Sequence, residues 1–212
     1  MLTKLVILGK SDATIAMIMD NLESNDIFPN IDIVNNLNLI IENSFDNPKF
    51  KWKFINELLD ENESMILGVS SPIVKKTILS KFNYKTFTFL NIIHNTASIS
   101  KTIKLGKGNV INNHVSVSAH TQIGDFVNIN RNVGIGHHTV INNFVTINPS
   151  VSVGGNVIIG EGSTLGIGAV IIDHITIGKN TIIGAGAVVT KNIPNNVIAY
   201  GNPCKIIKTN ET

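Results

Sequence analysis

Aliphatic residues return every six positions through the second half of the chain. Between residues 93 and 189 this phase holds without a break at seventeen consecutive sites: Ile93, Ile99, Leu105, Ile111, Val117, Ile123, Ile129, Ile135, Ile141, Ile147, Val153, Ile159, Leu165, Ile171, Ile177, Ile183 and Val189. The buried face of an α-helix repeats after about 3.6 residues and that of a strand after about two, so a strict period of six fits neither element. The pattern predicts a solenoid built from six-residue units.

Two other positions of the unit are restricted as well. From Leu105 onward, the residue directly after the aliphatic one is Gly at eight of fifteen sites and Asn at four. Because these two residue types best tolerate a positive φ, we expect them to form the turns. The residue four places after the aliphatic one is Val, Thr, Ser or Ala from Val115 to Ala187, except at Ile175. Small side chains at that position predict a narrow, dry interior.

Six-residue units of this kind form the sides of a triangular parallel β-helix with eighteen residues per coil. Fifteen units from Leu105 make five coils, and the two earlier units add most of a sixth. The coils should stack at about the inter-strand spacing of 4.8 Å, so residues eighteen apart form columns. His120 and His138 are one such pair. Residues 93–212 are therefore predicted to be a β-helix domain with a C-terminal tail.

The first ninety residues have a different pattern, in which apolar runs alternate with helical stretches. The apolar runs cover residues 3–9, 31–34, 65–69 and 86–93, and the helical stretches cover residues 15–22 and 72–82. This alternation predicts a small Rossmann-like α/β domain with a parallel sheet over residues 1–92. The aromatic residues Trp52 and Phe54, which stand among lysines, are interpreted as part of an edge strand, with stacking on a nucleic acid base as the alternative.

The carboxyl ends of parallel strands are where such a sheet binds ligands. The residues predicted to form this pocket are Gly9, Ser11, Asp12, Ala13, Asn35, Asn36, Gly68 and Ser70. The segment GKSDAT holds one glycine where a dinucleotide site requires three, so no NAD is expected. The alternative interpretation is a packing domain whose loops are merely polar.

Composition narrows the classes of partner. The net charge of +2 gives no electrostatic basis for binding nucleic acid or an anionic membrane. No apolar run reaches the roughly 18 residues of a membrane span, and the start of the chain is too short an apolar run for a signal peptide. The single cysteine suits a reducing compartment, so we expect a soluble cytoplasmic protein. Only six residues between Leu105 and Val189 are charged, which suggests that copies of the chain cover this surface.

Candidate chemistry is concentrated at His137, two positions after Ile135, where the repeat points the side chain outward. An imidazole near neutral pH can accept the proton that a nucleophile loses. A single surface histidine usually has no catalytic role. The residues around His137 make it a candidate for one. Cys204 lies outside the repeat, so a covalent acyl-enzyme is not expected.

The segments NINRNVGIGHHTVINNFVTINPSVSVGGNVIIGEGSTLGIGAVI and IIGAGAVVTKNIPNNVIAYGNPCKII resemble the hexapeptide-repeat acyltransferases. Within that superfamily, the chain is most similar to bacterial N-acetyltransferases of nucleotide-linked amino sugars, such as those of bacillosamine synthesis, and to sialic acid O-acetyltransferases. The resemblance implies a left-handed β-helix, a homotrimer, and acetyl-CoA as co-substrate without a metal. It also implies that His137 is the general base of a direct transfer and that Asn130 supports the active site.

The resemblance also implies roles for further residues, and the sequence differs from the family at two positions. His138 stands where the family has a carboxylate that orients the base, and Thr146 stands where a relative has a histidine that contacts the acyl donor. Gly155 follows His137 by one coil, so its N–H is expected to hold the oxyanion. A pantetheine arm is expected along a column that includes Ile167 and Ala185. Lys205 is a candidate for contact with a CoA phosphate, and a solvated surface lysine is the alternative interpretation.

The function expected from these residues is acetyl-CoA-dependent N-acetylation of a nucleotide-linked amino sugar. The alternative within the superfamily is O-acetylation of sialic acid or another sugar, because an oxygen nucleophile needs the same base. A hexapeptide-repeat carbonic anhydrase, which binds zinc through three histidines, and a non-catalytic scaffold are the alternatives from other classes.

Overall fold

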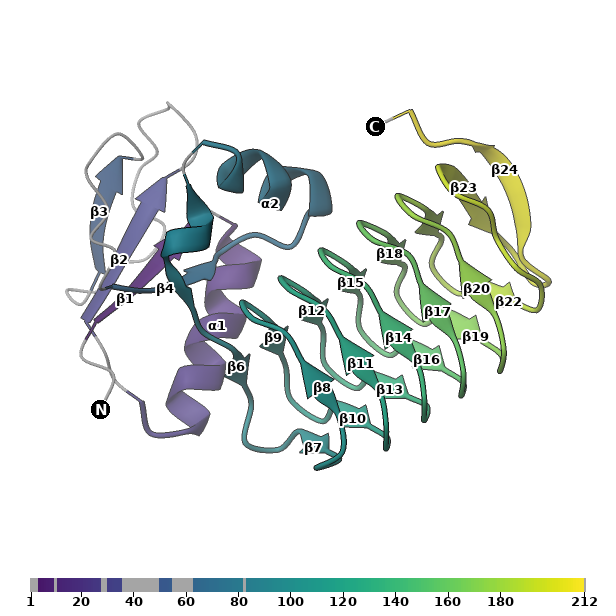
Figure 1. Ribbon diagram of the computed structural model, residues 1–212, viewed down its shortest axis with the longest axis horizontal. Coiled ribbons are helices and arrows are strands. Elements are labelled where there is room, and N and C mark those ends of the chain that lie inside the picture. Colours follow the sequence, from purple (N-terminus) through teal and green to yellow (C-terminus); the bar gives the residue numbers. More distant parts are fainter. Residues whose placement is uncertain are drawn as a thin grey trace.

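A small α/β unit at the N-terminal end leads into a long solenoid, and the C-terminal segment turns back from the far end of this solenoid toward the α/β unit (Figure 1). The computed structural model describes residues 4–9, 11–27, 30–35, 50–54, 63–81 and 83–211. None of the helices in these ranges is long and apolar enough to cross a membrane.

The α/β unit is built on a five-stranded parallel sheet of order β3-β2-β1-β4-β5. Its elements are β1 (Lys4–Leu8), α1 (Asp12–Ser24), β2 (Asn30–Asn35), β3 (Phe50–Phe54), β4 (Ser64–Leu67), α2 (Pro72–Leu79), the 3₁₀ helix η1 (Tyr84–Thr86) and β5 (Thr88–Phe89). The predicted alternation of strands and helices is confirmed, and the segment around Trp52 is an edge strand, as expected.

Both faces of the sheet are buried at its central strands β1 and β4, as parallel strands require. Leu5 and Ile7 pack with α1 on one face, while Val6 and Leu8 pack with α2 residues on the other. Each of the two cores also contains a solenoid residue: Val110 lies in the first and Phe126 in the second. The α/β unit is therefore packed directly against the solenoid.

The solenoid has three flat faces made of stacked two-residue strands. The first face contains β6 (Ile92–Ile93), β9 (Val110–Ile111), β12 (Asn128–Ile129), β15 (Thr146–Ile147), β18 (Thr164–Leu165) and β21 (Ile182–Ile183), and it is extended by β23 (Val197–Tyr200) and β24 (Lys205–Thr209). The second face contains β7 (Ser98–Ile99), β10 (Ser116–Val117), β13 (Gly134–Ile135), β16 (Ser152–Val153), β19 (Val170–Ile171) and β22 (Val188–Val189). The third face contains β8 (Lys104–Leu105), β11 (Gln122–Ile123), β14 (Val140–Ile141), β17 (Ile158–Ile159) and β20 (Thr176–Ile177).

Three corners connect these faces, and each is named here by the face that precedes it. The first corner follows the first face, the second corner follows the second face and the third corner follows the third face, from which the chain returns to the first.

The predicted periods of six and eighteen are confirmed. Ile135 pairs with Val117 in the coil before it and with Val153 in the coil after it. The small residues four places after each aliphatic residue are buried, from Val115 at 1% exposure to Ala187 at 0%. Together they fill a continuous apolar core.

The expected reason for the glycines is wrong. The positive φ angles occur three residues after the aliphatic residue, for example at His138 (58°) and Ser150 (61°), not at the glycine directly after it. Gly136 is required by close packing instead, because a Cβ there would lie 2.4 Å from the backbone carbon of Gly154 in the next coil. Contact between successive coils therefore selects glycine at this position.

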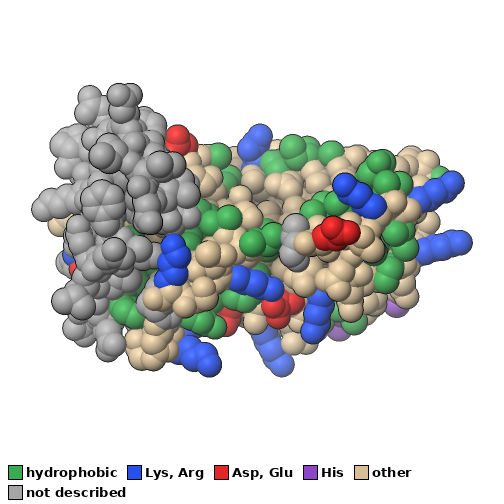
Figure 2. Space-filling view, turned by 90° about the horizontal axis from the view of Figure 1, so that it is seen from above, with side chains coloured by type: hydrophobic (Ala, Val, Ile, Leu, Met, Phe, Trp, Pro, Cys, Tyr) green, Lys and Arg blue, Asp and Glu red, His purple; other side chains and the backbone are tan. Residues whose placement is uncertain are grey.

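Aromatic packing joins the α/β unit to the third corner. The rings of Phe126 and Phe144 stack one coil apart with centroids 5.4 Å apart, and Phe89 packs edge-on against Phe126 at 4.9 Å. The same hydrophobic cluster contains Ile78 and Leu79, so α2 also packs against the third corner. On the face of the molecule seen in Figure 2, charged side chains are scattered among many uncharged ones.

Candidate functional site

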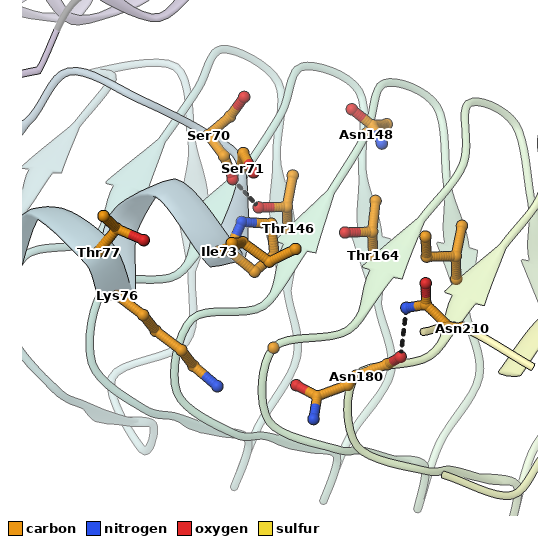
Figure 3. Close-up of a pocket in the computed structure, with 13 residues that line it drawn as sticks. Ser70, Ser71, Ile73, Lys76, Thr77, Thr146, Asn148, Thr164, Asn180 and Asn210 are labelled. Carbon is orange, nitrogen blue, oxygen red and sulfur yellow. Dashed lines mark hydrogen bonds between the residues drawn. The ribbon is translucent and has the colours of Figure 1, made fainter. Parts of the chain in front are cut away.

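A cavity of about 540 Å³ lies where α2 faces the first face and the third corner (Figure 3). Its walls come from the start of α2, three strands of the first face, two coils of the third corner and the C-terminal segment. The lining residues are Ser70, Ser71, Pro72, Ile73, Lys76, Thr77, Thr146, Asn148, Gly162, Thr164, Asn180, Ile182 and Asn210.

Hydrogen bonds fix two sides of this cavity. Thr146 Oγ1 donates to the backbone oxygen of Ser70 at 2.5 Å, which joins the first face to the loop before α2. On the opposite side, Asn210 Nδ2 donates to the backbone oxygen of Asn180 at 2.8 Å and holds the C-terminal segment in place (Figure 3). Figure 3 also shows Thr164 in the column after Thr146, in agreement with their strand pairing.

The cavity wall combines apolar surface with uncharged polar groups and has little net charge. Most of its polar groups are hydroxyls and amides, and Lys76, the one cation among the described residues that line it, forms an ion pair with Glu161 at 2.8 Å. Such a lining is suited to the hydroxyl groups of an uncharged ring more than to a free anion.

A buried lysine lies directly behind this wall. Lys75, on α2, is 0% exposed, and its Nζ donates to the backbone oxygen of Phe126 at 2.8 Å and to Thr146 Oγ1 at 3.4 Å. Burial lowers the pKa of this amine to about 7, since the charged form loses its hydration.

The predicted strand-end pocket is partly assembled in the structure. Gly9 N donates to Val34 O, Gly68 N to Leu8 O, and Ser11 N to Gly68 O, so the ends of β1, β2 and β4 meet as expected. A Cβ on Gly68 would lie 2.6 Å from the Gly9 oxygen, which explains the glycine at this contact.

The remaining residues of the predicted pocket are more dispersed. Ser70 lines the cavity, whereas Asp12 and Ala13 lie exposed in the first turn of α1 and do not line it. Asn35 is the last residue of β2, and Asn36 lies outside the described residues.

His137 and His138 form an exposed pair at the second corner. Their Nδ1 atoms are 3.1 Å apart, and their rings are nearly perpendicular at 85°. The prediction that His120 and His138 share one column is confirmed, with ring centroids 4.8 Å apart and ring planes tilted by 40°. The backbone of His138 is fixed by its positive φ of 58° and by its N–H bond to Ala119 O at 3.0 Å.

The expected role of the Gly155 N–H is not supported. That N–H already donates to the carboxylate of Asp173, one coil further on, at 2.8 Å. Gly155 instead makes room for the imidazole of His137, because a Cβ there would lie 2.8 Å from Cε1 and 2.9 Å from Nε2. The glycine is therefore a steric requirement for the ring position, and its N–H is not a free oxyanion donor.

The other predicted site residues do not meet His137 within one chain. Thr146 lies on the first face, and Asn130 lies at the first corner, where its Oδ1 accepts from the N–H of Arg131. Ile167 and Ala185 form an exposed column along the first corner, in the predicted register. Lys205 is exposed on β24. The second corner, which carries His137, lies across the prism from the first face.

Sequence reasoning missed most of the cavity. Part of it was visible in the columns, since Thr146, Thr164 and Ile182 stand eighteen apart, as do Gly162 and Asn180. The contribution of α2 carried no periodic signal. Among the described residues, no three or more His, Cys, Asp or Glu side chains are grouped so that they could hold one metal ion.

Comparisons with known proteins agree with this architecture. The family model described as bacterial transferase hexapeptide (six repeats) matches residues 156–191. None of the curated proteins matches the chain significantly.

Several solved structures share the fold over nearly the whole chain. A mutant of perosamine N-acetyltransferase from Caulobacter crescentus, solved with CoA and GDP-perosamine, has a TM-score of 0.86 at 24% identity, with 98% of each chain covered. The acetyltransferase domain of PglB from Neisseria gonorrhoeae, solved with acetyl coenzyme A, has a TM-score of 0.84 at 23% identity and covers 97% of this chain and 100% of that one. WeeI from Acinetobacter baumannii has a TM-score of 0.84 at 20% identity, with the same coverage. The protein therefore has the fold of perosamine N-acetyltransferase, including both the α/β unit and the hexapeptide-repeat solenoid.

Proposed function

We propose that the protein is an acetyl-CoA-dependent N-acetyltransferase that acts on the amino group of a nucleotide-linked sugar. The observation that carries this proposal is the agreement in fold, along the whole chain, with an enzyme that binds CoA and GDP-perosamine. The exposed His137–His138 pair and the cavity under α2 supply the base and the acceptor site that the reaction requires.

In this proposal, residues 1–92 form a Rossmann-like domain that holds the nucleotide, and residues 93–212 form a left-handed β-helix that carries the chemistry. The meeting of Gly9, Ser11 and Gly68 at the strand ends supports a nucleotide site there. Ser70 connects this edge to the cavity, which takes the sugar ring.

The active site lies between two copies of the chain. Within one copy, the cavity opens on the first face and His137 projects from the second corner, so they cannot act on the same molecule. A homotrimer of parallel solenoids places the second corner of one copy near the first face of the next. The exposed apolar residues Ile158, Ile167, Val170 and Ile172 support such an assembly.

His137 acts as the general base. A proton on His137 Nδ1 is donated to Nδ1 of His138, which leaves His137 Nε2 free to accept a proton from the attacking amine. The amine nitrogen forms a bond to the thioester carbon, the C–S bond breaks, and the proton passes to the departing CoA sulfur. Cys204 has no part in this transfer, and burial raises the pKa of its thiol, which makes it a poorer nucleophile at neutral pH.

An assay with defined sugar nucleotides tests the proposal. Purified protein is incubated with acetyl-CoA and GDP-perosamine, and in parallel with UDP- and dTDP-linked 4-amino sugars. Release of free CoA thiol and a gain of one acetyl group on the sugar nucleotide, measured by mass spectrometry, are the expected results. A matched sugar nucleotide with a hydroxyl in place of the amine should give no product. Acetylation of that analogue or of free sialic acid, without reaction of any amino sugar, would favour O-acetylation instead.

A further inference from the structure

Lys75 joins three structural elements through one buried amine. Its side chain extends from α2 to the Phe126 carbonyl at the third corner and to Thr146 on the first face. Thr146 in turn donates its own proton to Ser70 O. None of the described carboxylates forms an ion pair with Lys75, so the amine is held by these neutral oxygen atoms.

We propose that Lys75 is a positioning residue for the acceptor cavity, which acts by fixing the hydroxyl of Thr146 and the Ser70 loop against the first face. The inference rests on the proposed function, because its expected effect is a change in KM for the sugar nucleotide. Lys75 itself does not line the cavity, whereas Thr146 and Ser70 both do.

The hydrogen-bond directions support this role. The Thr146 hydroxyl has one proton, which is donated to Ser70 O, so its lone pairs remain to accept from Lys75. With the amine in place, the hydroxyl is held in one orientation and the loop carrying Ser70 is held against β15. Without the amine, the buried Phe126 carbonyl and the Thr146 oxygen lose their donor, and the wall is free to rearrange.

A neutral amine suits this position better than a fixed cation. The site is fully buried, and burial lowers the Lys75 pKa to about 7, so the residue carries little charge above that pH. Arginine stays protonated at every accessible pH and would place an unpaired charge behind the cavity. Lysine therefore supplies donors without a permanent buried charge.

The test compares Lys75→Met, which keeps the volume but removes the donors, with Lys81→Met on an exposed lysine just after α2. Lys75→Met should raise KM for the best amino-sugar nucleotide of the panel by about five- to tenfold, while KM for acetyl-CoA changes by less than about twofold. Lys81→Met should leave both values unchanged. A purely structural role for Lys75 would lower the active fraction and the Tm but leave both KM values as they were, and that result would overturn the proposal.

A second measurement needs no substrate. Hydrogen exchange of the backbone amides over residues 69–74 and 145–148 should become faster in Lys75→Met and in Thr146→Val, and the double variant should be no faster than the more affected single one. Additive effects would contradict the coupling of these two residues. If no sugar nucleotide is acetylated, the proposed function fails while this exchange experiment still decides the role of Lys75.

Discussion

The Nδ1 atoms of His137 and His138 lie 3.1 Å apart at an exposed corner of the solenoid, so one ring must donate a proton to the other. His138 in turn lies in one column with His120 one coil below, at 4.8 Å between ring centroids. Because an imidazole carries no negative charge, His138 can orient His137 but cannot stabilise its cation as a carboxylate would.

The roles of the two histidines can be separated by mutation. His137→Ala should lower kcat by about 10² to 10⁴, because it removes the general base, while KM for each substrate changes little. His138→Ala should cost less, since it removes only the orienting partner. Steady-state kinetics on both variants test this order, and a larger loss of kcat in His138→Ala would reverse the assignment.

A carboxylate in place of the His138 imidazole is predicted to preserve or increase kcat. His138→Glu should preserve or increase kcat, because a negative charge beside His137 stabilises the imidazolium formed in the transition state.

The absence of a side chain at Gly155 is predicted to be essential for the position of the His137 ring and therefore for kcat. A Cβ at this position would overlap the His137 ring at 2.8 Å, so Gly155→Ala should displace the ring and lower kcat by about tenfold or more. Gly134→Ala is the matched control, since a Cβ there has no atom within 4 Å. Equal kcat values for the two variants would mean that the ring position is not critical.

A bulky residue in the cavity should affect one substrate only. Thr164→Trp fills space beside Thr146, so KM for the sugar nucleotide should rise strongly while KM for acetyl-CoA stays nearly constant. Thr164→Ser retains the hydroxyl and serves as the control. A parallel rise in both KM values would place the acyl donor in this cavity.

The lowered pKa of Lys75 predicts how stability depends on pH. The pKa is about 7 in the folded protein against 10.5 for an ordinary lysine, so between these values the unfolded chain binds one more proton. The free energy of unfolding should therefore rise with pH over this window, with a contribution from Lys75 of about 1.4 kcal/mol per pH unit. Below pH 7 the full penalty for charging the buried amine is present.

Lys75→Met isolates that contribution. Denaturant unfolding of both proteins at pH 7, 8 and 9, at one protein concentration, should give a smaller slope for the variant. The nearby charged groups Lys76, Glu161, Lys107 and Asp125 are present in both proteins and cancel in the difference. Identical slopes would show that the amine is not held at a lowered pKa.

The solenoid could be predicted from the sequence because each six-residue unit of the structure is also a six-residue unit of the chain. Ile135 and its equivalents define the register of the coils. The eighteen-residue spacing correctly predicted that His120 and His138 lie next to each other in one column. The same column logic would have revealed the error at Gly155, since Asp173 stands eighteen residues later with its carboxylate on the Gly155 N–H.

The cavity could not be predicted in this way. It depends on how α2 packs against the third corner through Phe126 and Phe144, and no periodic pattern encodes that contact. Lys75 appears in the sequence as one of two adjacent lysines, and only the packed structure separates buried Lys75 from Lys76, which forms an ion pair with Glu161.

The central claim, that His137 of one copy acts on a sugar held by the next, is tested most directly by mixing one variant with a low kcat and one with a high KM for the sugar nucleotide, assayed at a sugar-nucleotide concentration near the wild-type KM. His137→Ala and Thr164→Trp proteins are denatured, combined in equal amounts, refolded together and assayed with acetyl-CoA and the best amino-sugar nucleotide. If each site is shared between neighbouring copies, random assembly should restore roughly a quarter of the wild-type activity, because a site is intact only where a subunit with His137 meets one with a normal cavity. Each variant refolded alone should show little activity at this sugar-nucleotide concentration, and wild-type protein refolded with either variant controls for recovery and mixing. No restored activity in the mixture, with full recovery in the controls, would contradict a site built from two copies of the chain.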